Sequence, residues 1–255
     1  MDVQEDHMPT LRVLKVLEEL SKADEAMTLS QLARACSCPK STLSPIVRTL
    51  AKHRYICCGT EDLSYSLGSQ AFVLGNSYQF EGSILDIIQQ QMEELVGNIH
   101  EISHLGVLSG KQIVYLKKVT PSKPMQLLSL VGKKLPAYAT ALGKALLQDH
   151  SKEELLELFP EEFEAFTEHT LKNAEALYAD IHQHSDGFAY ETEEIAPYAR
   201  CIALPLRYKG SIVAALSVSF MNFDLSQEKI EQIKSQLKQS VNLIEKIMKS
   251  QGFYY

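Results

Sequence analysis

The chain has 255 residues, 45% of them hydrophobic, and a formal net charge of -7. No apolar run reaches the roughly 18 residues of a membrane-spanning helix, and the N-terminal sequence MDVQEDHMPT lacks the basic and apolar segments of a secretory signal. The five cysteines form no disulfide framework, which agrees with a reducing compartment. We therefore expect a cytoplasmic protein of one large or two ordinary domains, with no membrane partner.

The N-terminal part of the chain predicts three helices. The first spans residues 10–22, and its buried stripe consists of Val13, Leu14, Leu17 and Leu20. The second follows Thr28, a good N-cap with Gln31 at the spacing of a capping box. After a break at residues 36–38, Pro39 introduces a third helix with one apolar face, formed by Leu43, Ile46, Val47 and Leu50.

The other face of the third helix is polar and basic. Residues 28–60 contain five Lys or Arg and no Asp or Glu, whereas the rest of the chain carries 20 basic and 32 acidic residues. An ordinary helical hairpin with a solvated face is one interpretation, but this charge segregation favours a helix-turn-helix in a DNA major groove. We predict that DNA is contacted by Lys40, Ser41, Thr42, Ser44, Arg48, Thr49 and Lys52.

A β-hairpin is predicted next, because β-prone runs at residues 55–58 and 63–67 flank a turn that begins at Gly59. Three helices followed by a hairpin form a winged helix-turn-helix. Residues 69–81 predict a linker helix, and Ser83 is expected to cap a long apolar helix that ends near residue 98. The predicted division is therefore a DNA-binding domain at 1–68, a linker at 69–81 and a second domain at 82–255.

The second domain alternates runs of strands with runs of helices. Strands are predicted at 102–108, 112–119, 125–131, 188–191, 201–206 and 212–220. Helices are predicted at 140–148, 152–158, 173–184 and 226–249. Segregation of this kind indicates an α+β fold with an antiparallel sheet.

The last two predicted strands each have a face of small residues. Alternation groups Cys201, Ala203 and Pro205 in one strand and Ala215, Ser217 and Ser219 in the other. A solvated face would more often carry Lys, Glu or Thr, so the pattern favours a ligand cavity with two hydroxyls and a thiol. Thr140 is expected to cap a helix whose free N–H groups would suit a carboxylate.

Several segments resemble the IclR-type transcriptional regulators. They are PKSTLSPIVRTL, YSLG, VGKKLPAYATALGKALL, FTEHTL, RCIALP and AALSVS, and they follow in order within about residues 10–249. The resemblance implies an α+β chain with a winged helix-turn-helix, a linker helix and an effector-binding domain related to GAF folds. It also implies dimers or dimers of dimers on palindromic operators in double-stranded DNA, controlled by a small metabolite. We expect no enzyme activity, metal or cofactor.

Carried over motif by motif, the resemblance implies an effector site made of Leu127, Leu135, Ala141, Leu142, Glu191, Cys201, Ser217 and Ser219. These groups suggest a metabolite with one carboxylate. The chain departs from the family pattern at Arg54 and Tyr198, where glycine is usual. It departs also at Pro45, which should kink the third helix.

A metal or redox sensor and an enzyme are the two alternative functions. A metal or redox sensor would use Cys36, Cys38, Cys57 and Cys58, but their spacing is not that of the usual zinc knuckles. An enzyme would use Cys201 as nucleophile beside Glu191, but no histidine is convincingly placed as its base among His169, His182 and His184.

Overall fold

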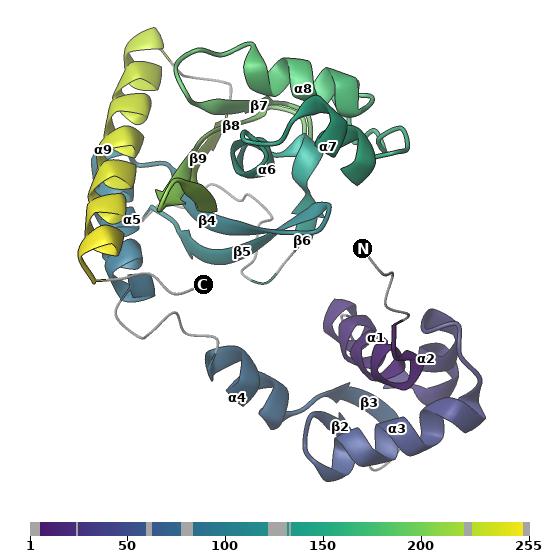
Figure 1. The fold of residues 1–255 in the computed structure, drawn as a ribbon. Coiled ribbons are helices and arrows are strands. Elements are labelled where there is room, and N and C mark those ends of the chain that lie inside the picture. The colour runs from purple at the N-terminus through teal and green to yellow at the C-terminus, as the bar shows by residue number, and fades with distance from the viewer. Residues whose placement is uncertain are drawn as a thin grey trace. The chain divides into compact units, whose positions relative to one another are not determined.

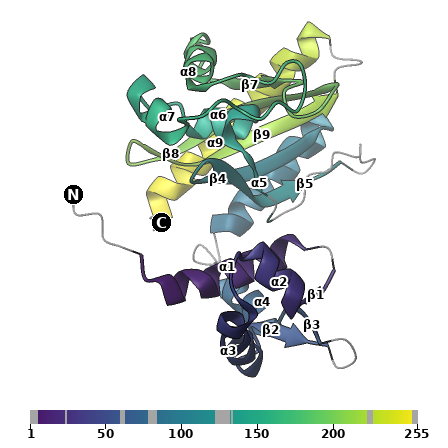
Figure 2. The same cartoon turned by 90° about the vertical axis from the view of Figure 1, so that its right-hand side faces the viewer.

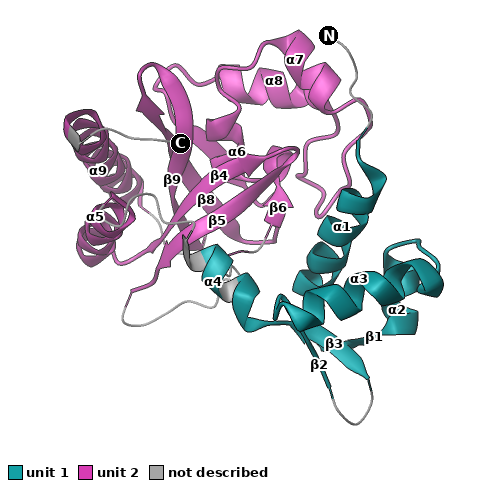
Figure 3. Cartoon of the chain, turned by 60° about the horizontal axis from the view of Figure 1, so that its bottom comes forward, with its two compact units in different colours: residues 1–79 teal, residues 80–255 magenta. Residues whose placement is uncertain are grey.

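A computed structural model describes residues 6–23, 25–59, 63–77, 84–121, 132, 134–221 and 226–251. The chain forms two compact units, residues 1–79 and 80–255 (Figure 3). The predicted three-part division with a separate linker stays a prediction. Within the described ranges, no helix is long and apolar enough to cross a membrane.

The N-terminal unit contains the predicted helices and hairpin (Figure 1). Its helices are α1 (Met8–Lys22), α2 (Leu29–Ala35), α3 (Lys40–Lys52) and α4 (Ser69–Ser77). Its antiparallel sheet has the order β1-β3-β2, formed by β1 (Met27–Thr28), β2 (Ile56–Cys58) and β3 (Ser64–Leu67). The capping box is confirmed, since Thr28 and Gln31 each accept a hydrogen bond from the other's backbone N–H. Strand β1 was not predicted.

The core of this unit joins all three helices of the DNA-binding fold to the hairpin. Its buried residues are Val16, Leu20, Leu32, Cys36, Leu43, Val47, Leu50 and Ile56. The prediction that Leu14 is buried was wrong, because that side chain is 50% exposed. The stripe of α1 runs instead through Val13, Val16, Leu17 and Leu20, at helical spacing, and Leu14 lies about 100° around the helix from Val13.

Helix α3 runs from Lys40 to Lys52 with Pro45 on its exposed side. It ends in a Schellman motif, in which Tyr55 N–H donates to Leu50 O (2.9 Å) and Arg54 N–H to Ala51 O (3.0 Å). Arg54 has φ 60°, a conformation that favours glycine, and is one of seven such non-glycine residues in the described part of the chain. The arginine at this position therefore carries a steric cost.

Replacing Arg54 by glycine should raise the free energy of unfolding by about 0.5–1 kcal/mol, because glycine adopts the left-handed conformation without steric penalty. Urea denaturation of the full chain measures the change in the transition of the N-terminal unit. Lys52→Gly, inside α3, is the matched control and should lower stability by about 1 kcal/mol. Destabilisation by both glycines would contradict the strain assigned to Arg54.

The C-terminal unit has a six-stranded antiparallel sheet in the order β6-β5-β4-β9-β8-β7. Its strands are β4 (Ile102–Ser109), β5 (Gln112–Val119), β6 (Lys134–Pro136), β7 (Ala189–Thr192), β8 (Ala199–Tyr208) and β9 (Ser211–Met221). Its helices are α5 (Ile84–Ile99), η1 (Ala137–Ala139), α6 (Ala141–Leu146), α7 (Lys152–Leu158), α8 (Ala174–His182) and α9 (Gln227–Gln251).

These elements form three layers, which confirms the predicted α+β class (Figures 1 and 2). Helices α5 and α9 cover one face of the sheet through a large aliphatic core that includes Leu105, Leu204 and Val218. Helices α6, α7 and α8 cover the other face. They pack there on a second hydrophobic core, to which the sheet contributes Ala203 and Ala215. Strand β6 was not predicted, and the strand predicted at 125–131 lies outside the described residues, as does Ser83.

Helix α6 lies unusually close to the sheet. All of its residues are buried, and Leu142 Cδ1 would be only 3.1 Å from a Cβ on Gly106 in β4. Gly143 is more tightly constrained, because a Cβ there would be 2.1 Å from Ala137 O in η1. The small-residue face of β8 and β9 is therefore no solvated surface, and part of it serves to accommodate α6.

Candidate functional site

The predicted DNA-contacting residues lie on one helix, α3, which is held by its buried residues Leu43, Val47 and Leu50. Thr42 and Ser44 are half-buried, whereas the other five are exposed: Lys40, Ser41, Arg48, Thr49 and Lys52. Two of them bond within the helix, Arg48 Nε to Ser44 O (3.4 Å) and Thr49 Oγ1 to Pro45 O (2.9 Å). This face of α3 is an accessible polar surface with three cations.

The predicted polar groups of the effector site share neighbouring strands of the C-terminal sheet. Glu191 in β7 is paired with Cys201 in β8, and Cys201 is paired with Ser219 in β9. Ser217, two residues along β9, is paired with Ala203 and with His104 of β4. Register thus brings the thiol, the carboxylate and both hydroxyls together, although the ligand role of these groups stays a prediction.

A buried histidine belongs to the same cluster. Cys201 Sγ donates to Ser219 Oγ (3.1 Å), which lies 3.4 Å from His104 Nδ1. His104 was not among the candidate bases for Cys201 in the sequence, which were His169, His182 and His184, and it reaches the thiol through Ser219. Burial, with Lys118 nearby, lowers the pKa of His104 to about 3. Burial raises the pKa of the Cys201 thiol well above its usual value. A protonated thiol and a weakly basic imidazole do not form a nucleophile–base pair.

Glu191 is 1% exposed and accepts hydrogen bonds at Oε1 from the backbone N–H groups of Glu194 (2.7 Å) and Ile195 (3.4 Å). Its Oε2 is buried and has no hydrogen-bond partner among the described residues. Burial raises the pKa of Glu191. The unsatisfied oxygen is an acceptor that a hydroxyl of a bound molecule could use.

A buried lysine pairs with Glu194, the residue whose backbone N–H donates to Glu191. Lys144 of α6 is 1% exposed, and its Nζ lies 2.5 Å from Glu194 Oε1 and 2.7 Å from Asp180 Oδ2 in α8. Burial raises the pKa of Glu194 to about 7, against the attraction of Lys144. Glu194 Oε2 is also buried without a hydrogen-bond partner in the described chain. Two carboxyl groups therefore share the positive charge of one lysine.

The apolar residues of the predicted site are spread more widely. Ala141 and Leu142 begin α6, whose N-cap is Thr140 as predicted. Leu135 lies on β6, at the opposite edge of the sheet from Glu191, and packs on the same core as α6. Leu127 lies outside the described residues.

Lys144 and His104 could have been recognised from the sequence. Lys144 stands in ATALGKALL, where apolar residues surround it on every side of a helix, a pattern that indicates a buried cation. His104 stands in the apolar strand ISHLGVL, in a sheet where central strands are covered on both faces. Their partners are 36 to 115 residues away and could not be assigned from local pattern.

The cysteines of the metal-sensor hypothesis are all free thiols. Cys36 is buried in the core of the N-terminal unit, Cys38 is half-buried, and Cys57 and Cys58 are exposed on β2. Within the described ranges, no group of three or more His, Cys, Asp or Glu residues could hold a metal ion. This arrangement gives the metal-sensor hypothesis no support.

Comparison with known proteins gives two family matches. The model described as "Bacterial transcriptional regulator IclR C-terminal" matches residues 78–246, and the "IclR helix-turn-helix domain" matches residues 10–56. A curated relative, the HTH-type transcriptional regulator XynR of Escherichia coli (strain K12), is 29% identical over 235 residues, which cover 90% of this chain and 92% of XynR. These relatives are transcriptional regulators and not enzymes.

Solved structures share the fold. An IclR transcriptional regulator from Alicyclobacillus acidocaldarius superposes with a TM-score of 0.83 at 19% identity, covering 95% of this chain and 99% of that chain. An IclR homologue from Microbacterium hydrocarbonoxydans, complexed with 4-hydroxybenzoate, has a TM-score of 0.77 at 22% identity. The match covers 94% of this chain and 99% of that chain.

The buried acids give a testable dependence of stability on pH. The pKa of Glu194 in the folded state lies above its ordinary 4.5. Its contribution is therefore full below about pH 4.5 and is lost as pH rises through about 7. Glutamine at position 194 resembles the protonated acid at every pH. The free energy of unfolding of the wild type, relative to Glu194→Gln, should thus fall between about pH 5 and 8.

Urea denaturation at several pH values checks this dependence. The control is Glu175→Gln, an exposed position on α8, which should leave the pH profile unchanged. Parallel profiles for the wild type and Glu194→Gln would show that Glu194 titrates in the folded protein as it does in water.

Proposed function

Because the chain belongs to the IclR family of bacterial transcriptional regulators, with a helix-turn-helix and an effector domain, we propose that it binds a specific palindromic operator through α3. A small metabolite with one carboxylate, bound in the C-terminal unit, modulates that binding. The exposed polar face of α3, in a stretch without any acidic residue, carries the proposal. Cations on a helix of this kind contact phosphates, and its hydroxyls reach base edges.

Self-association supplies the symmetry that a palindromic operator needs. Support comes from α1, where Met8, Leu11 and Leu14 are 55%, 37% and 50% exposed and follow one another at helical spacing. An exposed apolar stripe on a surface helix is typical of an interface. We propose a dimer or a dimer of dimers, and sedimentation equilibrium distinguishes the two.

The chemistry of the effector follows from the polar groups around β7, β8 and β9. Ser217 and Ser219 can donate hydrogen bonds to a carboxylate, whereas Glu191 repels a second one. The unsatisfied Oε2 of Glu191 suits a hydroxyl at the other end of the molecule. The compound in the Microbacterium homologue, 4-hydroxybenzoate, has one carboxylate and one hydroxyl. We therefore propose a hydroxylated monocarboxylate.

Lys40→Ala and Arg48→Ala should each weaken binding to the operator and lower its salt dependence by about one counterion, because each removes a phosphate contact. The operator is obtained by selecting a bound duplex from random sequence, and fluorescence anisotropy at several salt concentrations measures affinity.

Lys152→Ala, an exposed lysine on α7, is the control and should bind as the wild type does. Unchanged affinity and salt dependence for both α3 variants would exclude α3 as the DNA-contacting element. Failure of the selection to enrich any sequence would contradict sequence-specific binding itself.

Ser217→Ala should lower effector affinity about ten- to a hundredfold, because a hydrogen bond to a charged group contributes about 1.5–3 kcal/mol. The double change with Ser219→Ala should lower it further. Calorimetry uses the tightest binder from a panel of monocarboxylates that includes 4-hydroxybenzoate. Operator binding without ligand should persist in both variants.

Ser211→Ala, an exposed serine at the start of β9, serves as the control. Wild-type affinity in the double variant would place the effector elsewhere. A panel in which only dicarboxylates bind would contradict the proposed role of Glu191.

A further inference from the structure

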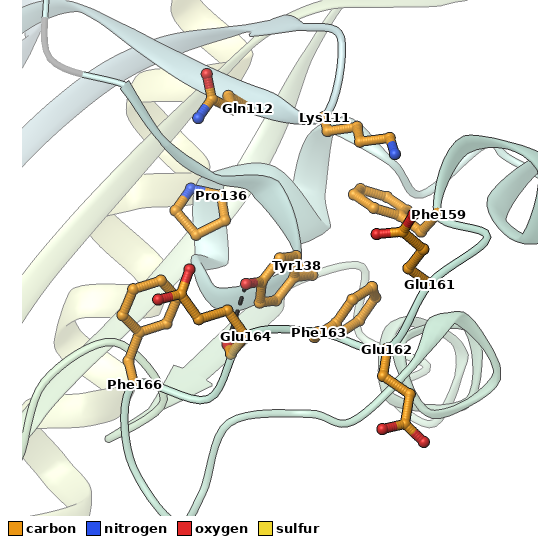
Figure 4. A pocket seen from close by; sticks show the side chains of 10 residues that line it. All are labelled: Lys111, Gln112, Pro136, Tyr138, Phe159, Glu161, Glu162, Phe163, Glu164 and Phe166. Carbon is orange, nitrogen blue, oxygen red and sulfur yellow. Dashed lines mark hydrogen bonds between the residues drawn. The ribbon is translucent and has the colours of Figure 1, made fainter.

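A cavity opens on the surface of the C-terminal unit, apart from the groups discussed above. Its volume is about 340 Å³, at the small end of ligand pockets. It lies between the start of β5, the β6–η1 segment and the loop that follows α7 (Figure 4). Ten residues line it, and none is a predicted effector-site residue: Lys111, Gln112, Pro136, Tyr138, Phe159, Glu161, Glu162, Phe163, Glu164 and Phe166.

Four aromatic rings form the apolar wall of this cavity. Tyr138 stacks on Phe163 at 4.0 Å between ring centroids, Phe159 meets Phe163 edge-on at 5.3 Å, and Phe166 is 6.5 Å from Tyr138. The Tyr138 hydroxyl donates to Glu164 O (3.0 Å) and is therefore satisfied within the protein. Phe166 is 43% exposed, so one ring of the cluster remains open to a ligand.

The loop that carries Phe163 and Phe166 is fixed by hydrogen bonds. The backbone N–H groups of Phe166 and Thr167 both donate to Thr170 Oγ1 (3.0 Å), and that hydroxyl donates to Glu194 O (2.6 Å). Phe163 N–H donates to Lys172 O (2.8 Å). The aromatic wall is thus formed before any ligand arrives, which lowers the entropy cost of binding.

The rim of the cavity is acidic. Glu161, Glu162 and Glu164 are exposed, and none has an ion-pair partner in the described part of the chain. Lys111 is the one cation among the lining residues, so the formal charge of the lining is -2. An aromatic face beside carboxylates attracts organic cations, because the ring quadrupole and the acids act in the same direction.

We propose that this cavity is a binding site for a small organic cation of the alkylammonium class, held against Phe166 and paired with Glu164. The acidic rim repels an organic anion. A purely apolar ligand would form no ion pair with the carboxylates of the rim. None of the residues that line the cavity belongs to the proposed effector site.

Choline is the probe, and its uncharged isostere 3,3-dimethylbutan-1-ol is the matched control. Titration of the full-length protein, observed by NMR at the ligand methyl groups, should show saturable choline binding with a dissociation constant on the order of millimolar and an upfield shift. The isostere should bind at least several times more weakly. Equal affinity for the isostere, or no saturable choline binding, would each overturn the proposal.

Phe166→Ala should weaken choline binding roughly two- to thirtyfold. Glu164→Gln should weaken it and reduce its dependence on salt. Glu168→Gln, with a side chain 90% exposed in the same loop but outside the cavity, is the control and should leave the affinity unchanged. Ser217→Ala should also have no effect. Wild-type affinity in both Phe166→Ala and Glu164→Gln, or a loss in Ser217→Ala, would place the cation elsewhere.

Discussion

One buried lysine determines much of the architecture between α6, α8 and the strands beneath them. A charged group that is 1% exposed is tolerated only with partners of opposite charge. Lys144 forms two ion pairs. The pair with Asp180 connects α6 to α8, and the pair with Glu194 connects α6 to the segment after β7. Because α6 is fully buried, the strands beneath it need small side chains, which Gly106, Ala203 and Ala215 provide.

The same pairing shapes the electrostatics of the interior. Burial raises the pKa values of both Glu191 and Glu194, although the attraction of Lys144 lowers them. Glu191 contacts the amide of Glu194, and Glu191 is also the strand neighbour of Cys201. An anion that approached Ser217 and Ser219 would therefore meet a region with more acidic than basic side chains.

Sequence pattern predicted the elements well where periodicity was strong. The helix-turn-helix, the capping box at Thr28 and the small-residue faces of β8 and β9 followed from spacing alone, whereas the register of these two strands did not. It failed where a signal was short or distant in sequence. Strands β1 and β6 have two and three residues, and Leu14 was assigned to the wrong side of α1. The cluster of Lys144, Asp180 and Glu194 could not be predicted, because its residues are distant in sequence and meet only in the folded chain.

The residues in the left-handed backbone conformation limit which substitutions this sequence can accept during evolution. Seven non-glycine residues among those described adopt positive φ, Arg54 among them. Each such conformation costs about 1 kcal/mol or more, and typical domains are stable by only about 5–15 kcal/mol. A fold that retains these residues tolerates fewer destabilising substitutions elsewhere. Operator and metabolite bind the folded state alone and add stability by mass action, so the abundance of this regulator in its cell should depend on what it has bound.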